Sequence, residues 1–301
     1  MAIDEDITLR KLEVFQAFMK LGNMARVSEA LGQSTVSVHR ALHSLEGGLR
    51  CPLFKRDGRK LIPLSTAYVF LEHAERILRD CEDGIRRTRE TAGFTATRLK
   101  IGGLYSMTVR TIPQLLVGLK TRRSSLDIDL TLGSNRELLH KLQEGQLDAI
   151  VIALSEPLRN PDLLEVPMFD DDIMFAAPLG SPYAQHTNID LLALRAERFV
   201  SLSDEFATYH DFTSAFARAG FAPEIAMRVG DIFSLMNLVS NGIGYALLPR
   251  RVADFSPKVQ LIPLAERYAI SQHIVLVIQR KRERDPNLLA LSAECRMIAE
   301  R

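Results

Sequence analysis

Hydrophobic residues recur at helical spacing in three short segments near the N-terminus. The first segment spans Thr8 to Asn23, with Gly22 as its stop. Asn23 is suited to cap a second helix, which Gly32 ends. A third helix can be capped by Ser34, and its buried stripe has 4-3-4 spacing: Val38, Leu42, Leu45 and Leu49. Two short helices joined by a tight glycine-containing turn predict a helix-turn-helix.

The outer face of the third helix is suited to DNA. Val36, Arg40 and His43 lie opposite the buried stripe, and no acid precedes Glu46 on this helix. Residues 20–62 carry eight Lys/Arg and three acidic residues, a local net charge of 8 − 3 = +5. The candidate DNA contacts in and near this region are Asn23, Arg26, Ser34, Thr35, Val36, Ser37, His39, Arg40, His43, Arg56, Arg59 and Lys60.

A β-hairpin is predicted next, because Asp57-Gly58 separates two short apolar runs. Its tip carries Arg56, Arg59 and Lys60, so we interpret it as a basic wing that touches phosphates. The alternative is a solvated hairpin tip. His39 and His43 have zinc-ligand spacing, but no third ligand is near and we expect no metal.

A long helix is predicted after Pro63-Leu64-Ser65, from residue 66 to about Ala92. Its apolar residues follow a heptad seam: Ala67, Leu71, Ala74, Leu78, Cys81 and Ile85. The seam could pack on the winged domain, but a dimerisation helix is favoured, since a DNA reader gains by binding two half-sites. Residues 93–97 are the expected linker.

From Arg98 onward, strand and helix patterns alternate, which predicts an α/β domain with a mostly parallel sheet. The expected strands are 99–103, 126–132, 149–154, 173–177, 199–201, 225–229, 245–248 and 273–277. The expected helices are 107–120, 136–144, 208–219, 232–241 and 286–300. The run Asp170 to Asp172 is interpreted as an acidic loop, and Gly242-Ile243-Gly244 lacks the context of a dinucleotide fingerprint.

Two strand-to-helix junctions offer ligand chemistry. Tyr105-Ser106 and Gly133-Ser134-Asn135 each place hydroxyl or amide groups at an expected helix N-terminus, where an anion is favoured. The alternative is that these side chains only cap the helices. Arg110 would add charge or point to solvent. No catalytic constellation appears, so we expect neither an enzyme nor a cofactor.

Composition narrows the class of protein. Hydrophobic residues make up 47% and charged residues 25% of 301 residues, which excludes a disordered chain. The net charge is only +1, so any basic surface is local. The three cysteines form neither a disulfide framework nor a zinc set. No signal peptide or membrane span is visible, and we expect a cytoplasmic protein with no membrane partner.

The chain resembles LysR-type transcriptional regulators. The resemblance rests on Ser34 to Glu46, Cys51 to Phe54, Arg56 to Arg59, Leu142 to Asp148 and Gly242 to Pro249. It implies a multidomain α+β and α/β fold: an N-terminal winged helix-turn-helix (1–65), a long linker and dimerisation helix (66–92), and a C-terminal periplasmic-binding-protein-like α/β domain of two lobes (98–301). The lobes would be 98–167 plus 269–301, and 168–268. A homodimer through the linker helix, assembled as a homotetramer on double-stranded promoter DNA, is implied, with RNA polymerase as a candidate further partner.

A narrower resemblance is to the LysR-type regulators of malonate utilisation. It rests on residues 37–46, 22–26, 104–106, 132–135 and 206–209. The common family recognition helix reads Ser-Gln-Pro-Ala-Leu-Ser-Arg; here Arg40 is kept, whereas Thr35, Val36 and His39 differ. The operator half-site is therefore expected to differ.

The resemblance implies a small anionic effector between the lobes, and malonate, a dianion, suits the site chemistry. The expected effector contacts are Tyr105, Ser106, Met107, Ser134, Asn135, Ser203, Thr208 and Tyr209. A LysR-type regulator of another small carboxylate is the alternative. A cytosolic small-molecule-binding protein and an α/β enzyme are remoter ones; the basic winged N-terminus counts against the first and the missing catalytic constellation against the second.

Overall fold

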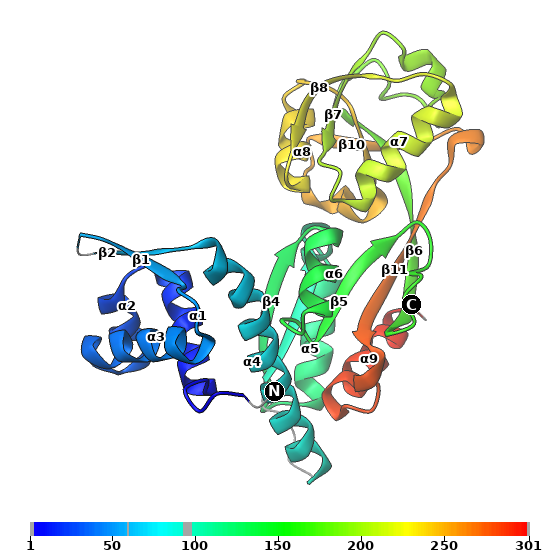
Figure 1. Cartoon of the computed structure of the whole chain (residues 1–301). Coiled ribbons are helices and arrows are strands. Elements are labelled where there is room, and N and C mark those ends of the chain that lie inside the picture. The colour runs from blue at the N-terminus through cyan, green and yellow to red at the C-terminus, as the bar shows by residue number, and fades with distance from the viewer. Residues whose placement is uncertain (1–2, 59, 93–97, 300–301) are drawn as a thin grey trace. The chain divides into compact units, whose positions relative to one another are not determined.

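A computed structural model of the chain describes residues 3–58, 60–92 and 98–299. The chain divides into two compact units, residues 1–94 and 95–301 (Figure 1). Arg59 and the expected linker at 93–97 lie outside the described residues. None of the helices in the described ranges is both long and apolar enough to cross a membrane.

The first unit begins with three helices: α1 (Leu9–Leu21), α2 (Met24–Leu31) and α3 (Thr35–Leu49). Gly22 and Gly32 end the first two in the left-handed conformation, which costs glycine little. Their core includes Leu12, Phe15, Phe18, Val27, Val38, Leu42 and Leu45. Strands β1 (Phe54–Asp57) and β2 (Lys60–Pro63) pair antiparallel, so the predicted helix-turn-helix and hairpin are both present.

Helix α4 (Ser65–Thr91) packs on the core of its own unit over its first half. Ala67 and Ala74 are fully buried there, and Leu71 and Leu78 pack against the same core. Ile85, further along, is half-exposed. The heptad stripe that predicted a dimer seam is thus largely used within the unit, which was the alternative interpretation.

The second unit has two lobes. In lobe I, β3 (Arg98–Leu104) lies between β4 (Asp127–Gly133) and β5 (Ala149–Leu154) and is parallel to both. The lobe also holds α5 (Thr111–Arg122), α6 (Asn135–Gln143) and α9 (Pro286–Ala299). Its core includes Leu99, Ile101, Leu115, Leu138, Ile150, Ile152, Leu276 and Leu291.

Lobe II contains the parallel pair β7 (Arg198–Leu202) and β8 (Glu224–Val229), with helices α7 (Ala207–Ala219) and α8 (Ile232–Ser240). Strands β9 (Ala246–Pro249) and β10 (Val259–Pro263) pair with β6 (Leu163–Pro178). Short 3-10 turns complete the unit: η1 (Tyr105–Thr108), η2 (Leu191–Leu194), η3 (Arg250–Phe255), η4 (Glu266–Tyr268) and η5 (Arg280–Arg282).

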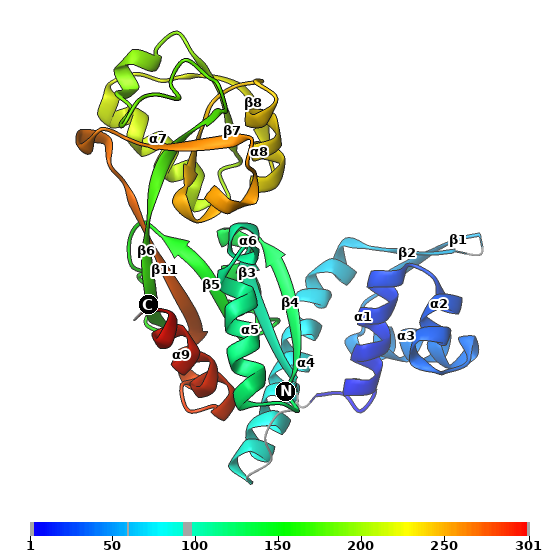
Figure 2. The same ribbon diagram turned by 180° about the vertical axis from the view of Figure 1, so that it is seen from behind.

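Two strands join the lobes, β6 and β11 (Ser271–Gln279), as both views show (Figures 1 and 2). They run antiparallel to one another. On β6, Met168 belongs to the core of lobe I, whereas Ile173 and Phe175 belong to a core of lobe II. We call this pair of strands the interlobe crossing.

Two expectations for this unit were wrong, and one strand was missed. The sheet is not mostly parallel, because β11 is antiparallel to both β5 and β6, and β9 and β10 are antiparallel to β6. Strand β10 was not predicted. Asp170 to Asp172 form part of β6 rather than an acidic loop; alternation along a strand lets Asp171 be buried while Asp170 and Asp172 stay exposed.

The first helix of lobe I also begins later than expected. Residues 105–108 form the 3-10 turn η1, and α5 begins at Thr111. Pro113 explains the shift, because proline is tolerated in a first helical turn but breaks a helix interior. Ser106 and Met107 therefore do not lie at the N-terminus of an α-helix.

Candidate DNA interface and effector site

The exposed face of α3 presents cationic, hydroxyl and apolar groups. Arg40 and His43 are exposed, and Val36 is 65% exposed although it is apolar. Arg40 forms no hydrogen bond or ion pair with a described residue. An exposed arginine can meet guanine edges or phosphates, and an apolar side chain can meet a thymine methyl group. The face predicted from the sequence is therefore exposed on the folded unit.

Two of the predicted DNA contacts also cap helices. The Asn23 side chain accepts from the N–H groups of Ala25 and Arg26, at 2.8 and 3.4 Å. Ser34 Oγ accepts from Ser37 N at 3.0 Å and lies 2.8 Å from Ser37 Oγ. These bonds satisfy otherwise unpaired N–H groups and fix the start of each helix.

The β1–β2 hairpin touches the predicted recognition helix. Arg56 Nη2 lies 2.9 Å from His39 Nε2, so two predicted residues from different elements come together. Lys60 is exposed on β2. Glu46 is bonded to the backbone rather than to solvent alone. Its Oε1 accepts hydrogen bonds from Leu53 N at 2.8 Å and from Phe54 N at 3.0 Å. Glu46 thus attaches α3 to the start of the hairpin, a role the sequence pattern did not reveal.

In the second unit, a buried arginine lies at the interlobe crossing. The Arg251 side chain, from η3, is only 7% exposed. Its Nη1 donates to Asp171 Oδ2 at 2.7 Å and to Gln272 Oε1 at 2.8 Å, and its Nε donates to Ser106 Oγ at 2.9 Å. Ser106 lies in lobe I and Arg251 in lobe II, so this cluster holds the two lobes together.

The cluster continues into α7. Gln272 Nε2 donates to Asp211 Oδ2 and, at 3.4 Å, to Thr208 Oγ1, and Ser155 Oγ donates to Asp211 Oδ1 at 2.6 Å. Burial raises the pKa of the Asp211 carboxyl, although Ser155 and Gln272 oppose this by hydrogen bonding. Burial likewise lowers the pKa of the Arg251 guanidinium, against the attraction of Asp171.

The other predicted effector residues are distributed around this cluster. Ser134 caps α6, accepting from Glu137 N at 3.1 Å. Asn135 bridges the lobes: it donates to Ala153 O at 2.6 Å and accepts from Ala207 N at 3.2 Å. The remaining four have different exposures, since Met107 is fully buried in the core of lobe I and three others are partly exposed, Tyr105, Ser203 and Tyr209. Only Ser106 and Thr208 contact the buried cluster.

A cavity of about 580 Å³ adjoins this cluster. Its lining is rich in cations, so we call it the arginine cavity: Ser106, Arg110, Thr111, Gln114, Phe169, Asp171, Arg250, Arg251, Ala253, Asp254 and Ile298. It draws residues from both lobes. Its three arginines outnumber its two aspartates, and one aspartate, Asp171, is already paired with Arg251.

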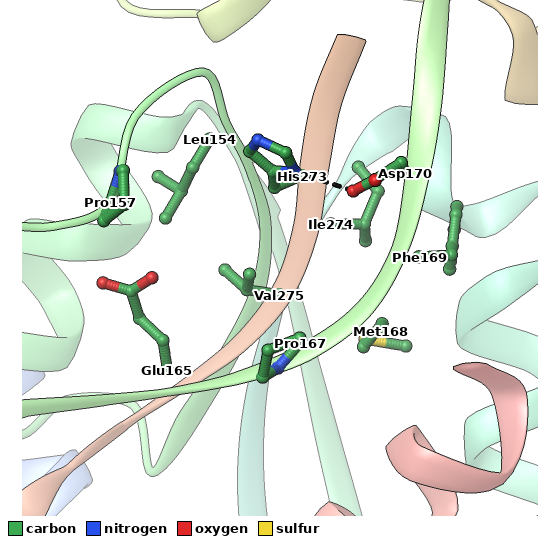
Figure 3. Close-up of a pocket in the computed structure, with 10 residues that line it drawn as sticks. All are labelled: Leu154, Pro157, Glu165, Pro167, Met168, Phe169, Asp170, His273, Ile274 and Val275. Carbon is green, nitrogen blue, oxygen red and sulfur yellow. Dashed lines mark hydrogen bonds and ion pairs between the residues drawn. The ribbon is translucent and has the colours of Figure 1, made fainter. Parts of the chain in front are cut away.

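A second cavity, of about 490 Å³, lies along the same strands (Figure 3). His273 Nδ1 and Asp170 Oδ1 face one another at 2.7 Å, and Glu165 lies nearer the start of β6. The rest of the lining is apolar: Leu154, Pro157, Pro167, Met168, Phe169, Ile274 and Val275. We call it the histidine cavity. Two carboxylates and no lysine or arginine line it, so it is unsuited to a dianion.

The central residues of the crossing were not predicted from the sequence. Arg251 and Gln272 carry no local motif, and their partners lie far away in the chain. The one signal was the Asp170–Asp172 run, because three consecutive acids within an apolar stretch need a cation or solvent. Asp171 has that cation in Arg251.

Comparison with known families now adds to this geometry. Residues 9–67 match the profile described as "Bacterial regulatory helix-turn-helix protein, lysR family", and residues 92–298 match "LysR substrate binding domain". The chain belongs to the LysR family. The resemblance seen in the sequence is confirmed, and this LysR-type protein is a DNA-binding transcriptional regulator rather than an enzyme.

Individual relatives of this LysR-type regulator support the same family assignment. It is 48% identical over 299 residues to the "Malonate utilization transcriptional regulator" of Klebsiella pneumoniae, covering 99% of this chain and 97% of that one. It is 27% identical to the "Hca operon transcriptional activator HcaR" of Escherichia coli (strain K12), covering 93% and 94%. Among solved structures, "full-length CbnR complexed with the target DNA" aligns with a TM-score of 0.75 at 22% identity, covering 97% of this chain and all of that one. The two-lobed fold predicted for this regulator is confirmed.

Proposed function

We propose that the protein regulates malonate-utilisation genes and responds to malonate or a closely similar small dicarboxylate. The observation that carries the proposal is the 48% identity, over almost the whole chain, to a malonate utilization transcriptional regulator. The proposal places the protein in the cytoplasm, with its promoter DNA.

DNA binding is assigned to residues 1–65. The exposed side chains of α3 would enter the major groove, with Arg40 as the main cation and Val36 and His43 beside it. Arg56 and Lys60 of the hairpin would reach phosphates, and so would Arg59, which lies outside the described residues. Asn23, Arg26, Ser34, Thr35, Ser37 and His39 complete the proposed contacts.

Residues 66–92 are proposed to form the dimer contact of a homotetramer. Because the inner stripe of α4 is packed against its own unit, the contact would use apolar side chains that stay exposed: Tyr68, Val69, Ile77 and Ile85. Such a dimer would place two recognition helices in successive major grooves, about 34 Å apart.

Effector binding is assigned to residues 98–301, with lobes 98–167 plus 269–301 and 168–268. Of the eight predicted contacts, Ser106 and Thr208 are best supported, since both join the cluster around the buried Arg251. A carboxylate needs such a cation when it leaves water. The outer part of the proposed site lies around the N-terminal ends of α6 and α7, with Ser134, Asn135, Ser203 and Tyr209.

The proposed switch is a change in the arrangement of the lobes, passed on through the assembly to DNA. A ligand shifts such an equilibrium only if it binds one arrangement better than the other. A molecule held by groups of both lobes satisfies this condition, because its contacts depend on their separation.

The test is fluorescence anisotropy of the full-length protein on the DNA upstream of its own gene, at fixed salt. Titrations are run without ligand, with malonate and with succinate, and random DNA of equal length is the control. We expect preferential binding of the upstream DNA that malonate changes and succinate does not.

The other possible results bear on the effector and on the target DNA separately. If only another carboxylate changes the binding, the protein still regulates this promoter, but that carboxylate replaces malonate as its effector. Specific binding indifferent to every dicarboxylate would contradict malonate as a direct effector of DNA affinity. Equal binding of random DNA would contradict this promoter as the target.

A further inference from the structure

We propose that the arginine cavity is a dicarboxylate site in which one carboxylate meets Arg251 and Ser106 and the other meets Arg110 and Arg250. This inference rests on the proposed function, because it names where the effector is held. Arg250 and Arg251 are not among the residues predicted from the sequence, and for Arg110 the sequence left open whether it adds charge or points to solvent.

The inner cation of this site is already in place. Only 7% of the Arg251 side chain is exposed. Its Nε and Nη1 donate hydrogen bonds to Ser106, Asp171 and Gln272. Its Nη2 forms no hydrogen bond with any described residue. Ser106 Oγ accepts from Arg251 and keeps its own hydroxyl hydrogen for donation. A carboxylate oxygen would satisfy both donors, and charge-assisted bonds of this type are the stronger ones.

A helix end faces the same cavity. Helix α5 is 12 residues long, and its N-cap, Arg110, makes no side-chain capping bond. Thr111 lines the cavity, and the N–H groups of Thr111 and Ile112 have no acceptor within the helix. Pro113 has no N–H to offer. The partial positive charge of this helix end therefore adds to that of Arg251.

Two further arginines stand where a second carboxylate would lie. Arg110 and Arg250 are exposed, line the cavity, and form no ion pair with another described residue. Asp254 also lines the cavity and has no partner in the described ranges, so it offsets one of these charges. With Asp171 paired to Arg251, the cavity keeps a net positive charge. The histidine cavity, lined by Glu165 and Asp170, does not.

The site also explains how a ligand could be sensed. Ser106, Arg110 and Thr111 belong to lobe I, whereas Arg250 and Arg251 belong to lobe II. A dicarboxylate bound by both sets would favour the arrangement of the lobes in which these groups converge.

The test is calorimetric titration of full-length wild type, Arg110→Gln and Arg250→Gln with oxalate, malonate, succinate, glutarate and acetate at fixed ionic strength. For the wild type we expect a dicarboxylate to bind at least about tenfold more tightly than acetate. Each variant should lose about tenfold in affinity for the dicarboxylate, because one charge-assisted bond is lost. Affinity for acetate should change little, since acetate needs only the inner carboxylate position.

Arg228→Gln is the matched control, because Arg228 is exposed on β8 and does not line the cavity. It should bind like the wild type. Arg110 and Arg250 are exposed and unpaired, so their variants should fold normally, which thermal unfolding checks.

The outcomes separate the two proposals. If malonate binds the wild type and both variants equally, the arginine cavity is overturned while malonate remains the effector. If succinate or another dicarboxylate binds in place of malonate, and both variants bind that ligand more weakly, the cavity proposal is supported and malonate is contradicted as the effector. If the wild type binds no dicarboxylate, the cavity proposal is overturned, whereas the DNA titration still decides whether the upstream DNA is the target of this regulator.

Discussion

The surface of α3 and the interlobe crossing hold their polar side chains in opposite ways. On α3, Arg40 and His43 are exposed and Arg40 has no protein partner in the described residues. At the crossing, Arg251 is buried and bonded to Asp171, Gln272 and Ser106. A large polyanion can reach solvated side chains, whereas a small ligand needs groups fixed in advance by protein partners. Substitution of an exposed side chain on α3 should therefore leave the free energy of unfolding nearly unchanged, whereas substitution of a buried side chain at the interlobe crossing should lower it.

The largest expected contrast is in thiol reactivity. Cys51 and Cys81 of the first unit are partly exposed, whereas Cys295 of the second is fully buried and burial raises its pKa to about 12. At pH 8 such a thiol is ionised in about one molecule in ten thousand, and the thiolate is the reactive form. Iodoacetamide followed by mass spectrometry should label Cys51 and leave Cys295 unmodified. In denaturant all three should react; labelling of Cys295 in the native protein would show that α9 opens.

The next effect concerns stability. Arg251→Ala leaves the buried Asp171 without its cation, so the second unit should lose about 3–5 kcal/mol of its free energy of unfolding. Denaturant titration with probes in each unit measures this, and the first unit should be unaffected. Arg250→Ala is the matched control and should change stability by less than about 0.5 kcal/mol. A loss no larger than that of the control would mean that Asp171 is solvated.

DNA affinity should respond more modestly. Arg40→Ala should weaken operator binding by about 1–3 kcal/mol, because one base or phosphate contact is lost, without changing malonate binding or folding. Anisotropy at fixed salt measures the loss. Arg76→Ala, on the exposed side of α4, is the control. Unchanged affinity for Arg40→Ala would remove this residue from the interface.

The smallest effect is a pH dependence at the crossing. Because burial raises the pKa of Asp211, its proton binds more tightly in the folded than in the unfolded protein. The resulting stabilisation is complete below the unfolded pKa and is lost as the pH rises through the folded one. Relative to Asp211→Asn, the wild type should therefore lose stability from about pH 4 upward, by at most about 1.4 kcal/mol per pH unit.

Urea unfolding at a series of pH values gives this difference directly. Asp172→Asn, an exposed neighbour of the buried Asp171 on β6, should follow the wild type instead. Parallel curves for wild type and Asp211→Asn would contradict a raised pKa at this position.

Prediction from sequence succeeded where the signals are local. Asn23, Ser34 and the two glycines after α1 and α2 lie within a few residues of the groups they cap, and the caps are found as expected. Prediction failed at two positions in the second unit. Pro113 sets the start of α5, although the apolar spacing alone predicted an earlier start. Asp171 was predicted to lie in a loop, because the cation that allows its burial in a strand is 80 residues away in the chain.

The sequence by itself determined the helix-turn-helix, the hairpin, the alternation of strands and helices over most of the second unit, and the family. Each depends on periodicity, caps and turns that act over short stretches of chain. Only the tertiary structure decided which side of α4 is free, that β6 and β11 run antiparallel between the lobes, and that Arg251 meets Ser106 across a separation of 145 residues. Burial of a charge is possible only where distant segments converge to satisfy it, and no short-range pattern records that convergence.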